Sequence, residues 1–100
     1  MHLISYDIQN DSLRTKIAKT LIRYGMYRVQ YSVFMGELSP RPLHAIEKAL
    51  NAYALHPQWT TEDAMMLLPL HQYSEDHIVF LGKEPDYWDE ISGKMHTLFL

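Results

Sequence analysis

The chain has 100 residues, 47% of them hydrophobic, with a formal net charge of −3 at pH 7 and no cysteine. This composition predicts one folded domain, and it excludes a disordered chain, disulfides, thiolate nucleophiles and cysteine-based zinc sites. No apolar run approaches the roughly 20 residues that span a bilayer, and no secretory signal pattern is visible, so we expect a cytoplasmic protein with no membrane partner.

A strand and a helix joined by a polar turn are the first expected elements. Residues 2–7 are mostly β-favouring or apolar, and they end in Asp7. Asn10 or Asp11 then suits the N-cap of a helix, and Gly25 suits a left-handed residue at its end. Between them an apolar stripe recurs at helical spacing, at Leu13, Ile17, Leu21 and Tyr24.

Basic residues gather in the first half of the chain. Lys16, Lys19 and Arg23 share the helix face opposite the apolar stripe. Residues 1–48 hold seven basic and four acidic residues, a balance of +3, whereas residues 49–100 hold two basic and eight acidic residues, a balance of −6. This asymmetry predicts one face for polyanions, and the alternative is an uneven solvated surface.

Residues 27–35 predict the longest strand of the chain. The odd-numbered residues are tyrosines, valines and a methionine, and we assign them to the core face. The even-numbered residues make a mostly polar second face: Arg28, Gln30, Ser32 and Phe34. That face can meet water, a second copy of the chain or a ligand, and Phe34 favours association.

The second half of the domain contains one more helix and two short apolar runs. An amphipathic helix is expected over residues 43–53, after the N-cap pattern of Ser39 and Pro40. Residues 64–68 and 77–81 predict two strands. The expected order is strand, helix, strand, helix, strand, strand, which predicts an α+β fold with both helices on one face of a mainly antiparallel sheet.

Two units are expected along the chain. We assign residues 1–84 to the folded domain and residues 85–100 to a tail, which is acidic and aromatic at first and apolar at its end. An exposed apolar terminus favours pairing, so we expect the tail to add as a strand to a two-fold mate or to another protein.

Asp7 is the sharpest candidate for chemistry. The histidines do not pair at the spacing of a helical metal site, and no Gly-rich phosphate loop is present. One carboxylate is a poor site for a divalent cation, but a homodimer with its axis near this strand end would bring a second Asp7 alongside. The pair could then hold Mg²⁺ or Mn²⁺ and activate water against a phosphodiester. The alternative is that Asp7 caps the following turn.

The first third of the chain resembles a known family. Ser5 to Ile8, then Asp11 and Arg14, Tyr24 and Gly25, and above all Arg28-Val29-Gln30 followed by Ser32-Val33-Phe34 are similar to the second CRISPR-associated protein family. The resemblance is dense over residues 3–36, and residues 63–70 and 78–82 resemble the third and fourth strands of the family. Met35 is a departure, because many relatives carry an acidic residue there.

The resemblance implies a ferredoxin-like fold and a homodimer through the open sheet faces. It also implies partnership with the CRISPR integrase subunit in capturing spacer DNA. Some members are described as metal-dependent endonucleases on RNA or DNA, with Asp7 as the implied metal ligand and catalytic residue. Others act as a DNA-holding bridge.

Two hypotheses follow. In the first, the dimer bridges integrase dimers and holds double-stranded DNA on basic residues, namely Arg14, Lys16, Lys19, Arg23 and Arg28. In the second, the dimer cleaves phosphodiesters with paired Asp7 residues and Mg²⁺ or Mn²⁺. Three further residues would lie at the dimer contact or beside the site: Gln30, Ser32 and Phe34.

Overall fold

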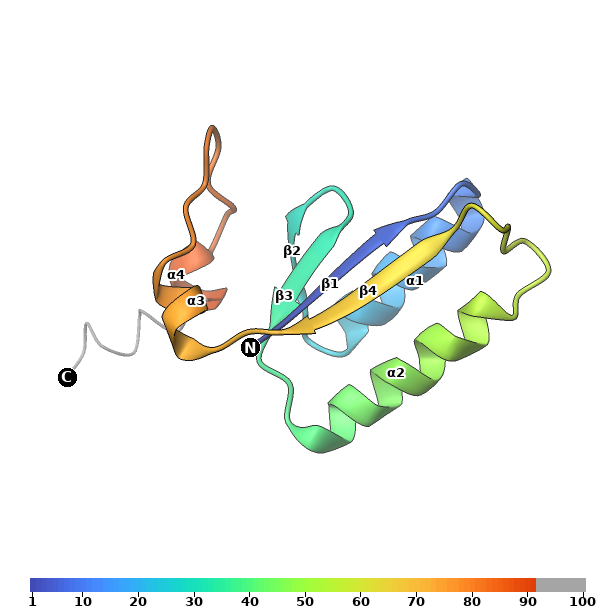
Figure 1. Cartoon of the computed structure of the whole chain (residues 1–100), viewed down its shortest axis with the longest axis horizontal. Coiled ribbons are helices and arrows are strands. Elements are labelled where there is room, and N and C mark those ends of the chain that lie inside the picture. Colours follow the sequence, from blue (N-terminus) through green and yellow to red (C-terminus); the bar gives the residue numbers. More distant parts are fainter. Residues whose placement is uncertain (92–100) are drawn as a thin grey trace.

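The structure is a computed structural model, and it describes residues 1–91. The elements in chain order are β1 (His2–Asp7), α1 (Asp11–Arg23), β2 (Tyr27–Gln30), β3 (Val33–Gly36), α2 (Pro40–Ala54), β4 (Ala64–Pro69), α3 (Gln72–Asp76) and α4 (Trp88–Ile91). The four strands form one sheet in the order β2-β3-β1-β4, with every pair antiparallel. Figure 1 shows α1 and α2 on one side of this sheet. The α+β, ferredoxin-like fold class is confirmed.

The expected long strand over residues 27–35 is wrong. The segment is a hairpin, in which β2 and β3 pair across a turn at Tyr31 and Ser32, with a register irregularity between Arg28 and Gln30. Strand alternation runs through this turn without a glycine, proline, asparagine or aspartate, so the usual signal for a turn is missing.

The predicted faces of this segment are also wrong. Phe34 is fully buried, and it belongs to the main core between the sheet and the helices, together with Ile4 and Ile17. Met35 points to the other side of the sheet, and Tyr31 is 69% exposed. Both faces of β3 are therefore covered, whereas the prediction assumed that only one face is buried.

The expected strand over residues 77–81 is absent, so the predicted element order is wrong as well. The order found is strand, helix, strand, strand, helix, strand, followed by the two short helices. Residues 78–82 are irregular, and Val79 and Leu81 are 79% and 94% exposed. A segment with alternating apolar residues forms a strand only where a sheet edge is free to hydrogen-bond with its backbone. This segment pairs with no described strand.

The start and the end of α1 lie at residues that the sequence predicts. The Asn10 side chain accepts a hydrogen bond from the Leu13 N–H at 2.9 Å, so Asn10 is the N-cap. Gly25 ends the helix with a φ of 89°, a conformation that favours glycine. Tyr24, expected in the buried stripe, is 37% exposed. Thr20 is buried instead, and its hydroxyl lies 2.8 Å from that of Tyr53 on α2.

A second, smaller core lies on the opposite face of the sheet. Met35, Trp88 and Ile91 are its buried members. Trp88 also meets Phe80 edge to face, with ring centroids 4.8 Å apart. Residues of the predicted tail therefore pack on the sheet as far as Ile91. The predicted pairing of the rest of the tail falls on residues 92–100, which lie outside the described residues. Within residues 1–91, no helix has the length and apolar character needed to cross a membrane.

Candidate nucleic-acid interface and the Asp7 strand end

Asp7 stands exposed at the end of a central strand. It is the last residue of β1, and its Cα lies opposite that of Ala64 on β4. On the other side, the N–H of the preceding residue, Tyr6, donates to the carbonyl of Ser32 at 3.1 Å. The backbone before the carboxylate is thus held from both sides. Within residues 1–91, the Asp7 side chain takes part in no hydrogen bond or ion pair.

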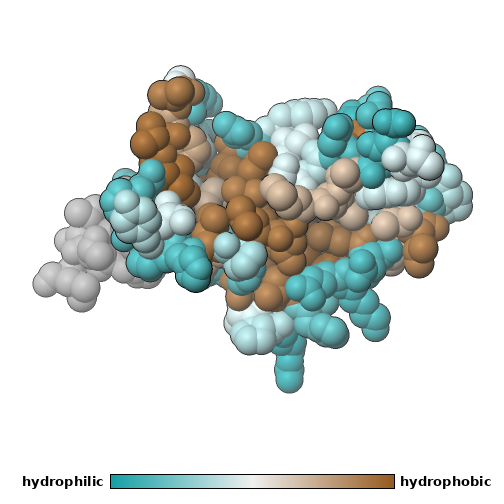
Figure 2. All heavy atoms as spheres, viewed as in Figure 1, coloured by the Kyte–Doolittle hydropathy of each residue, from teal (hydrophilic) through white to brown (hydrophobic). Residues whose placement is uncertain are grey.

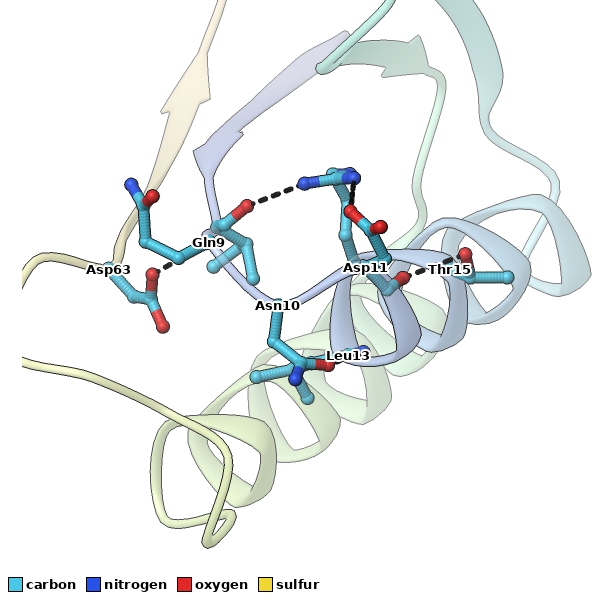
Figure 3. Close-up of polar contacts among 8 residues, drawn as sticks. Gln9, Asn10, Asp11, Leu13, Thr15 and Asp63 are labelled. Carbon is cyan, nitrogen blue, oxygen red and sulfur yellow. Dashed lines mark hydrogen bonds and ion pairs between the residues drawn. The ribbon is translucent and has the colours of Figure 1, made fainter.

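Other residues hold the turn after β1 (Figure 3). Asn10 caps the helix, and Asp63, 8% exposed, links this turn to the loop before β4. The Oδ1 atom of Asp63 accepts the Gln9 N–H and its Oδ2 atom accepts the Thr60 N–H, both at 2.8 Å. The bonds from Thr60 and Gln9 hold the pKa of Asp63 below its ordinary value. The alternative role for Asp7, capping the turn, is therefore filled by other side chains.

The sequence argument did not identify Asp63. Part of its role has a local signal, because Asp63 follows Thr60 by three residues and accepts from the backbone of that loop. Its bond to Gln9 joins residues 54 positions apart. Nothing in the local pattern indicates such a contact.

Arg14 is attached to the same turn. Its Nη1 atom donates to the Ile8 carbonyl at 2.8 Å, and its Nη2 atom donates to the Asp11 carboxylate. The hydrogen bond that Arg14 donates to Asp11 raises the pKa of Arg14, with a smaller contribution from Tyr31. The guanidinium carbon also lies 5.8 Å from the centre of the Tyr31 ring. Arg14 is a cation held in place by the turn, because both of its terminal nitrogens donate to that turn.

A hollow of about 300 Å³ lies between α1 and the β2–β3 hairpin, and we call it the α1–hairpin hollow. Its lining residues come from β1, α1 and the hairpin: Tyr6, Arg14, Thr15, Ala18, Lys19, Ile22, Arg28 and Tyr31. The Arg28 guanidinium carbon is 5.9 Å from the Tyr31 ring centre and 5.1 Å from that of Phe34. Three cations, two from α1 and one from β2, thus line one concave surface beside the exposed Tyr31 ring.

The five predicted basic residues do not all meet at this hollow. Arg14, Lys19 and Arg28 line it, whereas Arg23 lines a second hollow of about 350 Å³ between α1 and α2. Lys16 is exposed on α1. Within residues 1–91, only Arg14 among these five takes part in an ion pair. The other four positive charges are uncompensated on the surface that α1 and β2 present.

The residues expected beside the site have different environments. Gln30 is exposed at the end of β2, and Ser32 is partly buried in the turn. Phe34 is fully buried, with its ring stacked on Tyr6 at 6.1 Å, so it lies on no open face. Met35 pairs with Leu3, near the opposite end of β1 from Asp7. An acidic residue at that position would therefore lie far from the Asp7 of the same chain.

One chain does not supply a metal site at Asp7. The described residues, 1–91, contain no group of three or more His, Cys, Asp or Glu side chains that could hold a metal ion. Asp63, which precedes the residue opposite Asp7 on β4, already accepts two backbone N–H groups. Divalent cations such as Mg²⁺ need more oxygen ligands than one carboxylate offers, so the residues of a single chain do not fit the ion.

The family model described as CRISPR associated protein Cas2 matches residues 1–78. The chain belongs to the Cas2 family. A relative from Archaeoglobus fulgidus, named CRISPR-associated endoribonuclease Cas2 1, is 35% identical over 72 residues, which are 72% of each chain. The family resemblance inferred from residues 3–36 is thus confirmed and extended.

Solved structures agree with the Cas2 assignment in fold. A hypothetical protein from Thermus thermophilus, TT1823, superposes with a TM-score of 0.66 at 29% identity, covering 84% of this chain and 92% of the other. Cas2 of Streptococcus pyogenes superposes with a TM-score of 0.64 at 23% identity, covering 81% and 98%. At that identity the second likeness concerns the fold alone.

Proposed function

We propose that this Cas2-family protein is a dimeric subunit of CRISPR spacer acquisition, which binds duplex spacer DNA and bridges dimers of the integrase. The observation that supports this most directly is the set of uncompensated cations on α1 and β2. Lys16, Lys19, Arg23 and Arg28 make no ion pair within residues 1–91, and none is buried. Positive charge left free on one surface is suited to a polyanion.

This arrangement predicts binding through phosphates and not through base edges. Lysine and arginine side chains that neutralise phosphates release condensed counterions, so affinity falls with salt. If all five basic residues of one chain contact phosphates, log K falls with log salt with a slope of about −4.5 per chain. Such binding is independent of sequence, as a protein that captures many different spacers requires.

The dimer is proposed through the open face of the sheet. Tyr27, Met66 and Leu68 are 44%, 54% and 42% exposed there, although they are large and apolar. Figure 2 shows apolar residues gathered across the middle of the visible face, where Figure 1 places β1 and β4. A second copy of the chain presents the same surface, so a two-fold contact would cover both.

Two double variants test the DNA-binding proposal. Lys16→Glu with Lys19→Glu reverses two charges on α1, and Arg41→Glu with Lys48→Glu makes the same charge change on exposed residues of α2. Duplex affinity is measured by fluorescence anisotropy from 50 to 200 mM salt. We expect the α1 variant to lose affinity and salt slope, and the α2 variant to keep most of both. Equal losses of affinity in the two double variants would mean that binding depends on net charge alone and not on the α1 surface, and would contradict the proposal.

Bridging is tested with the integrase itself. Light scattering of the protein, the integrase and their mixture gives the mass of the assembly with and without duplex DNA. We expect one dimer of this chain to join two integrase dimers. A mixture that shows only the masses of the separate components, with and without DNA, would overturn the bridging role while leaving DNA binding intact.

A metal-dependent endonuclease that cleaves RNA or DNA is the second candidate. Asp7 favours it, because this carboxylate is exposed at a strand end that is paired on both sides, and it makes no hydrogen bond or ion pair with the described residues. The name of the Archaeoglobus fulgidus relative also specifies an endoribonuclease. Since one chain does not fit a magnesium ion, this candidate requires the Asp7 of a second chain at the same place. It therefore depends on the dimer as much as the first candidate does.

Asp7→Ala separates the two candidates. Under the nuclease proposal it abolishes cleavage of RNA and DNA in Mg²⁺ or Mn²⁺ and leaves the dimer folded, whereas Glu47→Ala, an exposed acid on α2, leaves cleavage unchanged. Under the DNA-binding proposal alone, Asp7→Ala leaves duplex affinity and spacer integration close to wild type. Equal cleavage rates in the wild type and Asp7→Ala would show that Asp7 takes no part in cleavage.

A further inference from the structure

A short acidic segment lies beside the basic edge of the sheet. Residues 83–90 hold four acidic residues and one basic residue, Lys83, and they lie beyond residues 1–78, which the family model matches. Figure 1 shows the chain between α3 and α4 as a loop on the β2 side of the sheet. We call residues 83–86, which include Glu84 and Asp86, the acidic loop.

A hollow of about 350 Å³ separates the acidic loop from β2, and we call it the β2–loop hollow. Arg28 and Gln30 line it on the β2 side, and residues 83–86 line it on the other. Asp86 lies 4.0 Å from the Lys83 ammonium, whereas neither Glu84 nor Arg28 takes part in an ion pair within residues 1–91. A carboxylate and a guanidinium, both without an ion pair, therefore line the same hollow.

Packing on both sides of the acidic loop holds it in this place. Phe80 precedes the loop and Trp88 follows it, and the two rings meet edge to face in the second core, where Trp88 is buried. Tyr87 between them has a φ of 61°, a conformation that residues other than glycine adopt at a cost. Such a conformation persists only where the surrounding structure imposes it, so the loop has a defined position beside β2.

A carboxylate beside Arg28 opposes the binding of phosphate. At a separation of about 8 Å in water, one negative charge lowers the affinity for a phosphate about twofold. Arg28 and Glu84 are both exposed, so the loop weakens the attraction of Arg28 for phosphate without covering it. The alternative is an acidic surface that only adds solubility, and such a surface would act equally from any part of the molecule.

We propose that the acidic loop is an autoinhibitory element, which weakens the hold of Arg28 on nucleic-acid phosphates. This inference rests on the proposed DNA binding and concerns the regulation of that same surface. Loss of the negative charges at Glu84 and Asp86 raises the affinity for duplex DNA. The gain is largest at low salt, because charges on the surface are screened over about 10 Å at 0.1 M salt.

Two double variants with the same change in net charge provide the test. Glu84→Gln with Asp86→Asn neutralises the acidic loop. Glu47→Gln with Glu62→Gln neutralises two exposed acids, on α2 and in the loop before β4, and neither lines the β2–loop hollow. The affinity for blunt duplex DNA is measured by fluorescence anisotropy at 50 and 200 mM salt. Each variant is checked for an unchanged melting temperature.

We expect the acidic-loop variant to bind duplex about 2- to 5-fold more tightly than the wild type at 50 mM salt, with a smaller gain at 200 mM. The control variant stays within about 1.5-fold of the wild type, because its charges are farther from the phosphates. Equal affinities of the acidic-loop variant and the wild type, or equal gains in both variants, overturn the inference and leave DNA binding intact. A wild type that binds no duplex contradicts the proposed function and this inference with it.

Arg28→Gln provides a second measurement. If the acidic loop acts on phosphate held by Arg28, neutralising the loop gives almost no gain in an Arg28→Gln protein, since neighbouring charges couple. Lys16→Gln is the matched background, because Lys16 is exposed on α1 and lies outside the β2–loop hollow. In that background the gain is expected to stay at the wild-type size. A gain of equal size in both backgrounds overturns the inference.

Discussion

Trp88 is expected to contribute a large part of the stability of this domain, although it lies ten residues beyond the segment that the Cas2 family model matches. Its side chain is 5% exposed in the second core, where it contacts Phe80 edge to face and packs near Met35. Truncating a buried tryptophan to alanine costs about 3–5 kcal/mol, because the apolar contacts are lost and the cavity closes only in part. Domains of this size are stable by about 5–15 kcal/mol, so Trp88→Ala would remove a substantial fraction.

Urea unfolding followed by circular dichroism measures this loss. With a slope of about 1.5 kcal/mol per molar urea, the midpoint falls by about 2–3 M in Trp88→Ala. Val79→Ala is the control, since Val79 is 79% exposed and its truncation should change stability by less than about 0.5 kcal/mol. A double-mutant cycle of Trp88 with Phe80 should give a coupling of about 0.5–1.5 kcal/mol.

Equal midpoints for Trp88→Ala and Val79→Ala would refute the reasoning, because they would mean that residues 88–91 do not pack on their own sheet in solution. The measurement is made at several protein concentrations, since a dimer would add a concentration-dependent term to the midpoint. The result matters for the proposed dimer, because the second core occupies part of the face through which two copies would meet.

Variants at three further positions test the turn after β1 and the end of α1. Asp63→Asn should lower stability at neutral pH, and its difference from wild type should shrink in acid. Because the pKa of Asp63 is lower in the folded state, its ionised carboxylate stabilises the fold at pH values above the ordinary carboxyl pKa. This stabilisation is lost as the pH falls through the folded-state pKa of Asp63. Urea midpoints of the variant and the wild type that differ equally at every pH would contradict this. Asn10→Ala should cost about 1 kcal/mol in urea unfolding, and Asn10→Asp much less, because aspartate retains the cap. Gly25→Ala should cost about 1 kcal/mol, although a Cβ there meets no atom within 4 Å, because alanine disfavours a φ of 89°; an unchanged midpoint would refute this.

Much of the first half of the fold could be read from the residues alone. The strand at residues 2–7, the helix that follows, its Asn10 cap and its Gly25 end each depend on interactions within a few positions of the chain. The strand at residues 64–69 was anticipated to within one residue. Local signals of this kind survive in the fold because nothing in tertiary packing opposes them.

The hairpin and the second core could not be read in this way. Ser32 is a weak turn former and Tyr31 is none, so the alternation predicts one strand where the chain reverses. The chain reverses because β3 pairs with β1, whose paired residues lie 28 to 34 positions earlier in the chain. The same pairing places Phe34 inside the main core and Met35 under Trp88, so both faces of the strand are buried.

For the site, the sequence by itself determined the residue types and the family: an acidic strand end, a basic helix and the pattern around Arg28 that is similar to Cas2. Only the tertiary structure decided which of these residues meet. It placed Arg14, Lys19 and Arg28 around one hollow, moved Arg23 to another, and assigned the turn to Asp63 and not to Asp7. The physical reason is that charge and hydrogen-bonding capacity belong to single residues, whereas their convergence depends on strand pairing between distant parts of the chain, which carries no local signal.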